Sequence, residues 1–172
     1  MVTALFLAWQ VIVLGVLETH FGSGYDDRRF DTLEARFEHR QEAFAEADAR
    51  MSELAAVHPR AERIGWSLAL ICVREPGRAA DSCKPTSARD KARYESLGGV
   101  DVIVRQSDDK HRTFFRFYAD DPPRYTLLHA PADTDVSSYA ADRGFRTTRS
   151  LTSGWTLLGP IPDVHREDEQ WQ

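Results

Sequence analysis

The sequence predicts an α+β protein in which an N-terminal transmembrane helix and a long amphipathic, coiled-coil-like helix precede a small ferredoxin-like (split βαβ) domain. Three observations support this prediction. The first 17 residues contain no charged side chain, phenylalanines recur at seven-residue spacing from residue 30, and short apolar runs alternate with two helical segments between residues 64 and 160. Together they describe an anchor, a stalk and one compact domain.

The composition excludes several classes of function. A chain of 172 residues holds one compact domain with an appendage. Its net charge of −5 and sequence pI of about 5.7 provide no basic field for nucleic acid, so no nucleic-acid partner is expected. The two cysteines, Cys72 and Cys83, lack the spacing of a metal cluster, a thioredoxin-like redox motif or a haem attachment site.

The opening segment, MVTALFLAWQVIVLGVL, predicts a membrane helix over residues 1–21. A helix over residues 2–17 covers about 24 Å, and the three residues Thr19, His20 and Phe21 extend it toward the ~30 Å hydrocarbon core. No Lys or Arg precedes the segment, whereas a cleaved signal peptide needs a positive start. A signal-anchor in contact with lipid is therefore the expected reading. A cleaved signal and a buried helix inside a protein complex are the alternatives.

The orientation of this anchor rests on two opposed signals. Four arginines follow the segment within residues 28–40, and the positive-inside rule would place the domain in the cytoplasm. Cys72 and Cys83, however, form an even pair that closes a short loop, as in oxidised extracytoplasmic domains. We therefore expect a disulfide between these cysteines. Because long domains translocate largely regardless of charge, we also expect a single-pass protein with its domain in the periplasm.

A long helix, or stalk, is predicted over residues 30–58, after a linker of turn-forming residues at 22–29. One face follows a 3-4 spacing, which is the pattern of a coiled coil. The stripe comprises Phe30, Leu33, Phe37, Arg40, Phe44, Ala47, Met51, Leu54 and His58. Its larger apolar members form the predicted partner-binding surface: Phe30, Leu33, Phe37, Phe44, Met51 and Leu54. The stripe could pair with a second copy, with the helix of a partner protein, or with the chain's own domain.

The domain is predicted over residues 64–160 and is followed by a polar tail, residues 161–172. Strands are expected at residues 64–73, 100–106, 112–119, 124–130 and 153–160, with helices at residues 87–97 and 135–144. The resulting order is β-α-β-β-β-α-β. Two helices would cover one face of such a sheet, and the long helix could cover the other face.

No motif for chemistry is present, so no catalytic residue, cofactor or metal site is predicted. The sequence has no HExxH, GxSxG, GxGxxG or GKS/T pattern. Asp108 and Asp109 could approach Asp133 and Asp135 to form a weak calcium site, but solvated turn residues are the expected reading. We therefore predict a non-catalytic accessory or assembly subunit that contacts an integral membrane protein complex. The alternative is an anchored sensor domain that binds a small ligand or an ion.

Overall fold

The computed structural model describes residues 23–106, 111–117 and 124–161. The predicted anchor and nearly all of the predicted polar tail lie outside these residues. No helix within the described residues is both long and apolar enough to cross a membrane. The elements, in chain order, are α2 Ser23–Val57, β1 Arg63–Trp66, β2 Leu70–Arg74, β3 Ser82–Pro85, α3 Ala88–Glu95, β4 Val102–Gln106, β5 Thr113–Phe117, β6 Arg124–His129, α4 Val136–Asp142, β7 Thr147–Thr152 and β8 Trp155–Ile161.

The chain divides into two compact units, residues 1–36 and residues 37–172, and α2 contributes to both. The helix begins at Ser23, so most of the linker predicted at residues 22–29 is helical. Its end at Val57, ahead of Pro59, agrees with the predicted stalk. The second unit contains the whole sheet and the other two helices.

The second unit is built on one eight-stranded sheet in the order β3-β2-β1-β4-β5-β6-β8-β7. Every neighbouring pair is antiparallel. The ferredoxin-like arrangement is therefore not confirmed, because a split βαβ fold contains neighbouring strands that run parallel. The mixed α+β class and the positions of β4, β5, β6 and β8 agree with the prediction, whereas β7 was not predicted.

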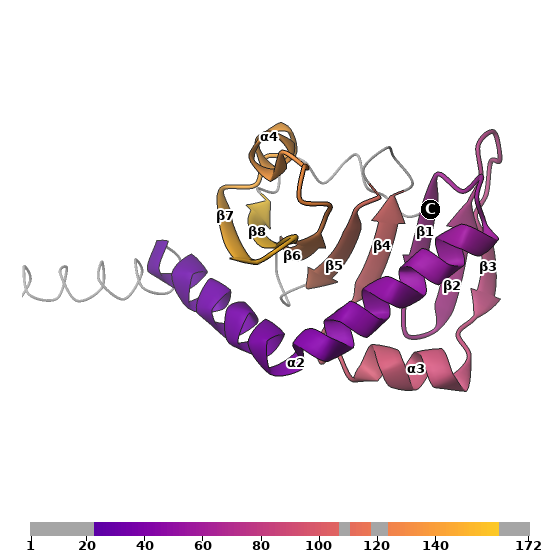
Figure 1. Ribbon diagram of the computed structural model, residues 1–172, viewed down its shortest axis with the longest axis horizontal. Helices are drawn as coiled ribbons and strands as arrows, with labels where there is room; N and C mark the ends of the chain where they lie inside the picture. The colour runs from indigo at the N-terminus through magenta and orange to yellow at the C-terminus, as the bar shows by residue number, and fades with distance from the viewer. Residues whose placement is uncertain (1–22, 107–110, 118–123, 162–172) are drawn as a thin grey trace, which may run out of the picture. The chain divides into compact units, whose positions relative to one another are not determined.

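The two faces of the sheet are covered by different helices (Figure 1). Side chains alternate across a strand, so neighbouring residues of β5 point to opposite sides. Phe115 packs against Phe44 of α2, with ring centroids 5.2 Å apart. Phe114 belongs instead to a buried cluster with Ala140 of α4. Helix α3 lies on the same face of the sheet as α2. Its Tyr94 contacts Trp66 of β1. Trp66 stands opposite Ile103 of β4, which stands opposite Phe115 of β5, so all three side chains share one face.

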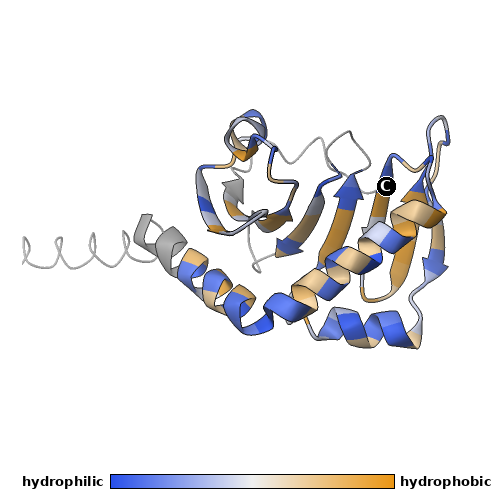
Figure 2. Ribbon diagram, viewed as in Figure 1, coloured by the Kyte–Doolittle hydropathy of each residue, from blue (hydrophilic) through white to orange (hydrophobic). Residues whose placement is uncertain are grey.

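The apolar stripe of α2 packs on the chain's own sheet from residue 37 onward, and Figure 2 shows the apolar and polar colours alternating along this helix. The ring centroid of Phe44 lies 6.4 Å from that of Phe117 and 6.3 Å from that of Trp155. The ring centroids of Phe37 and Trp155 are 5.1 Å apart. Four predicted partner-binding side chains are buried here: Phe37, Phe44, Met51 and Leu54. Phe30 and Leu33 belong to the first unit. Of the three alternatives for the stripe, the structure thus places residues 37–54 in the core of their own domain.

Arg40 interrupts both the helix and the stripe. Its φ of −131° and ψ of 20° are not helical, so α2 is kinked at this residue. The guanidinium donates a hydrogen bond of 2.6 Å to the carbonyl oxygen of Ser96, just beyond α3. Gly98 accommodates it, because a Cβ there would lie 2.4 Å from Nη1 of Arg40 and the φ of +66° also favours glycine. The charged member of the stripe therefore caps a neighbouring helix instead of entering the core.

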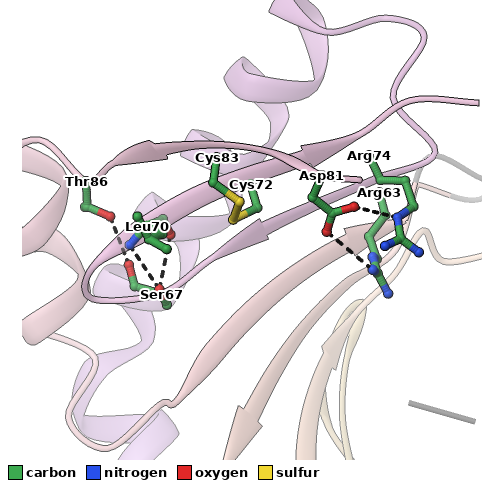
Figure 3. Close-up of a disulfide and its surroundings, with 8 residues drawn as sticks. All are labelled: Arg63, Ser67, Leu70, Cys72, Arg74, Asp81, Cys83 and Thr86. Atoms are coloured by element: carbon green, nitrogen blue, oxygen red, sulfur yellow. Dashed lines mark hydrogen bonds and ion pairs between the residues drawn. A yellow bond between two sulfur atoms is a disulfide. The ribbon is translucent and has the colours of Figure 1, made fainter. Parts of the chain in front are cut away.

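The predicted disulfide is confirmed (Figure 3). Cys72 of β2 and Cys83 of β3 stand directly opposite each other, with their Cα atoms 4.0 Å apart. Beside them, Asp81 bridges Arg74 on β2 and Arg63 on β1. A disulfide-bonded domain is consistent with an oxidising, extracytoplasmic location, because cytosolic thiols are kept reduced.

Candidate functional site: a groove between α2 and the edge of the sheet

A groove lies between the C-terminal part of α2, strands β2 and β3, and the start of α3. Three short periodic stripes of side chains line it. Arg50, Leu54 and His58 recur every fourth residue along α2, and Ile71, Val73 and Glu75 alternate along and just beyond β2. Ser82 and Lys84 alternate along the edge strand β3 and form the outer wall. The groove has a volume of about 330 Å³, near the lower end of the ~300–1,000 Å³ typical of small-molecule sites.

The floor of the groove is apolar and its ends are polar. Leu54, Ile71 and Val73 line the middle, and Pro85 completes the wall beside α3. Binding sites for small molecules have this composition, in which apolar side chains supply contact area and a few polar groups fix orientation. The groove can therefore hold an organic molecule with an apolar body.

The end of the groove beside α3 is closed by an ion pair. The Nε and Nη2 atoms of Arg50 donate to the two carboxylate oxygens of Asp90 at 2.9 and 3.1 Å. The remaining Nη1 donates to Glu53 at 3.0 Å. Burial raises the pKa of Asp90, but the hydrogen bonds from Arg50 and Ser87 outweigh it, and the pKa lies below its ordinary value of 3.8. Arg50 is thus committed to carboxylates of the protein itself.

The other polar groups of the groove differ in whether they are paired. Near the C-terminal end of α2, Arg78 pairs with Glu75 at 3.0 Å, beside His58. Lys84 is exposed and makes no ion pair with any described residue. Of the three cations that line the groove, only Lys84 is thus left without a carboxylate partner in the described part of the chain.

A second polar cluster, centred on Asp48, lies beneath α2. Nδ1 of His129 donates to Oδ2 of Asp48 at 3.0 Å, and Nη1 of Arg105 lies 3.3 Å from Oδ1. The His129 ring stacks on Trp155 with centroids 4.3 Å apart, and Arg105 also donates to the Thr113 hydroxyl at 2.7 Å. An Asp–His pair of this kind can orient a catalytic imidazole. Here, no hydroxyl or thiol is hydrogen-bonded to His129 within the described residues, and the cluster instead ties α2 to β4 and β6.

The pKa of Asp48 reports how strongly this cluster holds the carboxylate. Burial raises the pKa of Asp48. The hydrogen bonds from His129 and Thr113 and the neighbouring positive charges lower it by more than burial raises it, so the pKa lies below its ordinary value of 3.8. A carboxyl whose folded-state pKa is depressed stabilises the fold fully above its unfolded pKa. That stabilisation is lost as the pH falls through the folded-state pKa.

We therefore expect Asp48→Asn to reduce the free energy of unfolding by about 1–3 kcal/mol at neutral pH. The difference from the wild type should shrink as the pH falls from about 4 to below the folded-state pKa. Urea denaturation between pH 2.5 and 7 measures both effects. Asp133→Asn, at an exposed turn position, is the matched control. Parallel pH profiles for the wild type and Asp48→Asn would contradict this account.

The four carboxylates that were considered for a weak calcium site are not all in the described part of the chain. Asp108 and Asp109 lie outside it, and Asp135 is the N-cap of α4, where its side chain accepts from the Ser138 amide at 3.0 Å. No group of three or more His, Cys, Asp or Glu side chains among the described residues could hold a metal ion. Comparison of the chain with protein-family models, curated proteins and solved structures found no match.

The groove was not predicted from the sequence. Its floor requires Ile71 and Val73 to lie on a strand of their own, whereas the apolar run over residues 64–73 suggested one continuous strand. The available signals were the spacing of Arg50, Leu54 and His58 on α2 and the alternation of Ile71 with Val73. Each is also typical of ordinary core packing, so neither indicated a binding site.

Proposed function

We propose that this protein is a non-catalytic recognition domain that binds a small ligand in an oxidising, extracytoplasmic compartment. The observation that carries the proposal is the groove between α2 and β3, with its apolar floor and a lysine, Lys84, that no carboxylate of the described residues neutralises. The disulfide between Cys72 and Cys83 supports the compartment. The uncharged run at residues 1–17 supports attachment to a membrane, which makes an anchored sensor the fullest form of the proposal.

Native mass spectrometry of the full chain, purified from its own membranes without reducing agent, tests this proposal. The wild type is expected to carry a small molecule that is released on denaturation. Ser82→Trp places a large ring on the groove wall and should abolish the adduct. Ser150→Trp, at an exposed serine of the opposite edge strand β7, should retain it. An adduct that survives Ser82→Trp with unchanged stoichiometry would contradict the assignment of the groove.

A second candidate is the accessory subunit that acts through protein contacts. Strand β7 supports it, because Thr147–Thr152 forms one edge of the sheet and contains no proline, so its outer side could accept another strand. The same purification separates the two candidates. A stoichiometric protein partner that is lost in Ser150→Trp, together with the absence of any small-molecule adduct, would favour the accessory role.

A further inference from the structure

The charges around the groove indicate the class of molecule that it binds. We infer that the ligand is an organic monoanion, with a carboxylate held by Lys84 and an apolar body lying over Leu54, Ile71 and Val73. This inference rests on the proposed ligand-binding function and specifies the chemistry of that same site.

Lys84 is placed to meet the charged end of such a ligand. In the β2–β3 pairing it stands opposite Ile71, so its side chain leaves the sheet on the same face as the apolar floor. A lysine in this position can lay its aliphatic stem along the wall while its ammonium group remains at the rim. Because its charge is not neutralised by any described carboxylate, an incoming anion does not have to displace a partner.

The other charges of the groove favour one negative charge over two. Arg50 would be the natural bidentate partner of a carboxylate or phosphate, but each of its three nitrogen atoms already donates to Asp90 or Glu53. Asp90 and Glu75 are already paired with Arg50 and Arg78, so neither ion pair offers a positive charge to a second negative group of the ligand. A monoanion neutralises Lys84, which has no carboxylate partner among the described residues, whereas a phosphate dianion would leave one negative charge uncompensated.

The middle of the groove requires that the rest of the ligand be apolar. Leu54 and Val73 are buried and Ile71 is partly exposed, and none of the three side chains offers a hydrogen bond. A polar ligand would lose its hydration over this floor without compensation, whereas an aromatic or aliphatic body gains contact area. An aromatic or medium-chain carboxylic acid therefore fits both the volume and the chemistry of the site.

The test uses 2-naphthoate and its uncharged analogue 2-naphthamide as probes of the full chain. Two-dimensional amide NMR records the binding curve and locates it, because the amides of β2 and β3 should shift. Lys84→Met removes the charge and keeps the stem. It is expected to weaken naphthoate about 5- to 10-fold, which corresponds to about 1–1.4 kcal/mol, and to change naphthamide less than about two-fold. Lys84→Arg should restore most of the naphthoate affinity.

The outcomes separate this inference from the proposed function. If both probes shift the β2 and β3 amides and Lys84→Met weakens them equally, the groove binds ligands but the monoanion inference is overturned. If naphthoate shifts no groove amide while Ser82→Trp still removes the natural adduct in the mass spectrum, the ligand class is overturned and the proposed function stands. If the natural adduct also survives Ser82→Trp, both are overturned.

Discussion

Replacing Phe44 with alanine is expected to lower the free energy of unfolding by about 3–5 kcal/mol. The ring is fully buried and contacts Phe115 and Phe117 of β5 and Trp155 of β8. Its removal leaves a cavity between a helix and two strands, and these elements can close over the space only in part. Urea denaturation of the full chain, followed by far-ultraviolet circular dichroism, measures the loss.

The matched control is Val57→Ala at the end of the same helix. This valine is 72% exposed, so its truncation should change the stability by no more than about 0.5 kcal/mol. An effect of Phe44→Ala as small as that of the control would show that the stripe of α2 is not held on the sheet. It would then restore the partner-helix alternative for these phenylalanines.

Loss of the disulfide is the second large effect that we expect. The crosslink joins residues 11 positions apart, and for a closed loop of this length the chain-entropy model assigns about 3 kcal/mol. The double variant Cys72→Ser with Cys83→Ser should therefore be about 3 kcal/mol less stable than the oxidised wild type. Reduction with dithiothreitol should lower the wild type to the level of this variant and leave the variant itself unchanged.

The same bond tests the compartment. Protein taken from freshly lysed cells in the presence of an alkylating agent, without reductant, should retain the mass of the unmodified chain because neither thiol is free. A mass increase that corresponds to two alkylated cysteines would show that the bond is absent in the cell. The oxidising compartment in the proposed function would then be wrong.

Those elements that carry their own local signals could be predicted from the sequence. Helix α3 has Ser87 as its N-cap, where the hydroxyl accepts from the Asp90 amide at 3.1 Å, and α4 has Asp135 in the same role. Strands β4, β5, β6 and β8 combine alternation with aromatic or β-branched side chains. Within β5, Phe115 and Phe117 lie on one face of the sheet and Phe114 on the other, as the alternation of side chains along a strand requires.

The elements that escaped prediction depend on tertiary pairing or on a turn without the usual residues. The β1–β2 hairpin turns at residues 67–70, SLAL, which contain no Gly, Pro, Asn or Asp. The turn is held by Ser67, whose amide donates to the Leu70 carbonyl at 2.9 Å and whose hydroxyl accepts from the Leu70 amide at 3.1 Å. Strands β3 and β7 are polar edge strands that exist because a neighbour pairs with them, so periodicity could not reveal them.

The candidate site could not be predicted for a related reason. A disulfide follows from two cysteines at short separation, but a groove requires knowledge of how a helix lies relative to a sheet. Here it depends on the position of α2 relative to β2 and β3. The site therefore depends on the β1–β2 hairpin, which the sequence pattern did not indicate.

The packing of Phe44 on Trp155 has a consequence for the order in which this chain can fold. The helix is made before the sheet, yet one of its main contacts lies 111 residues later in the chain, on β8. During synthesis or export, the apolar stripe of α2 must remain partly uncovered until β8 has emerged, because Phe37 and Phe44 both contact Trp155. Contacts of such long sequence separation slow folding and leave apolar surface exposed to aggregation. A chain that ends before Trp155 should thus require a chaperone for its helix rather than simply lose one strand.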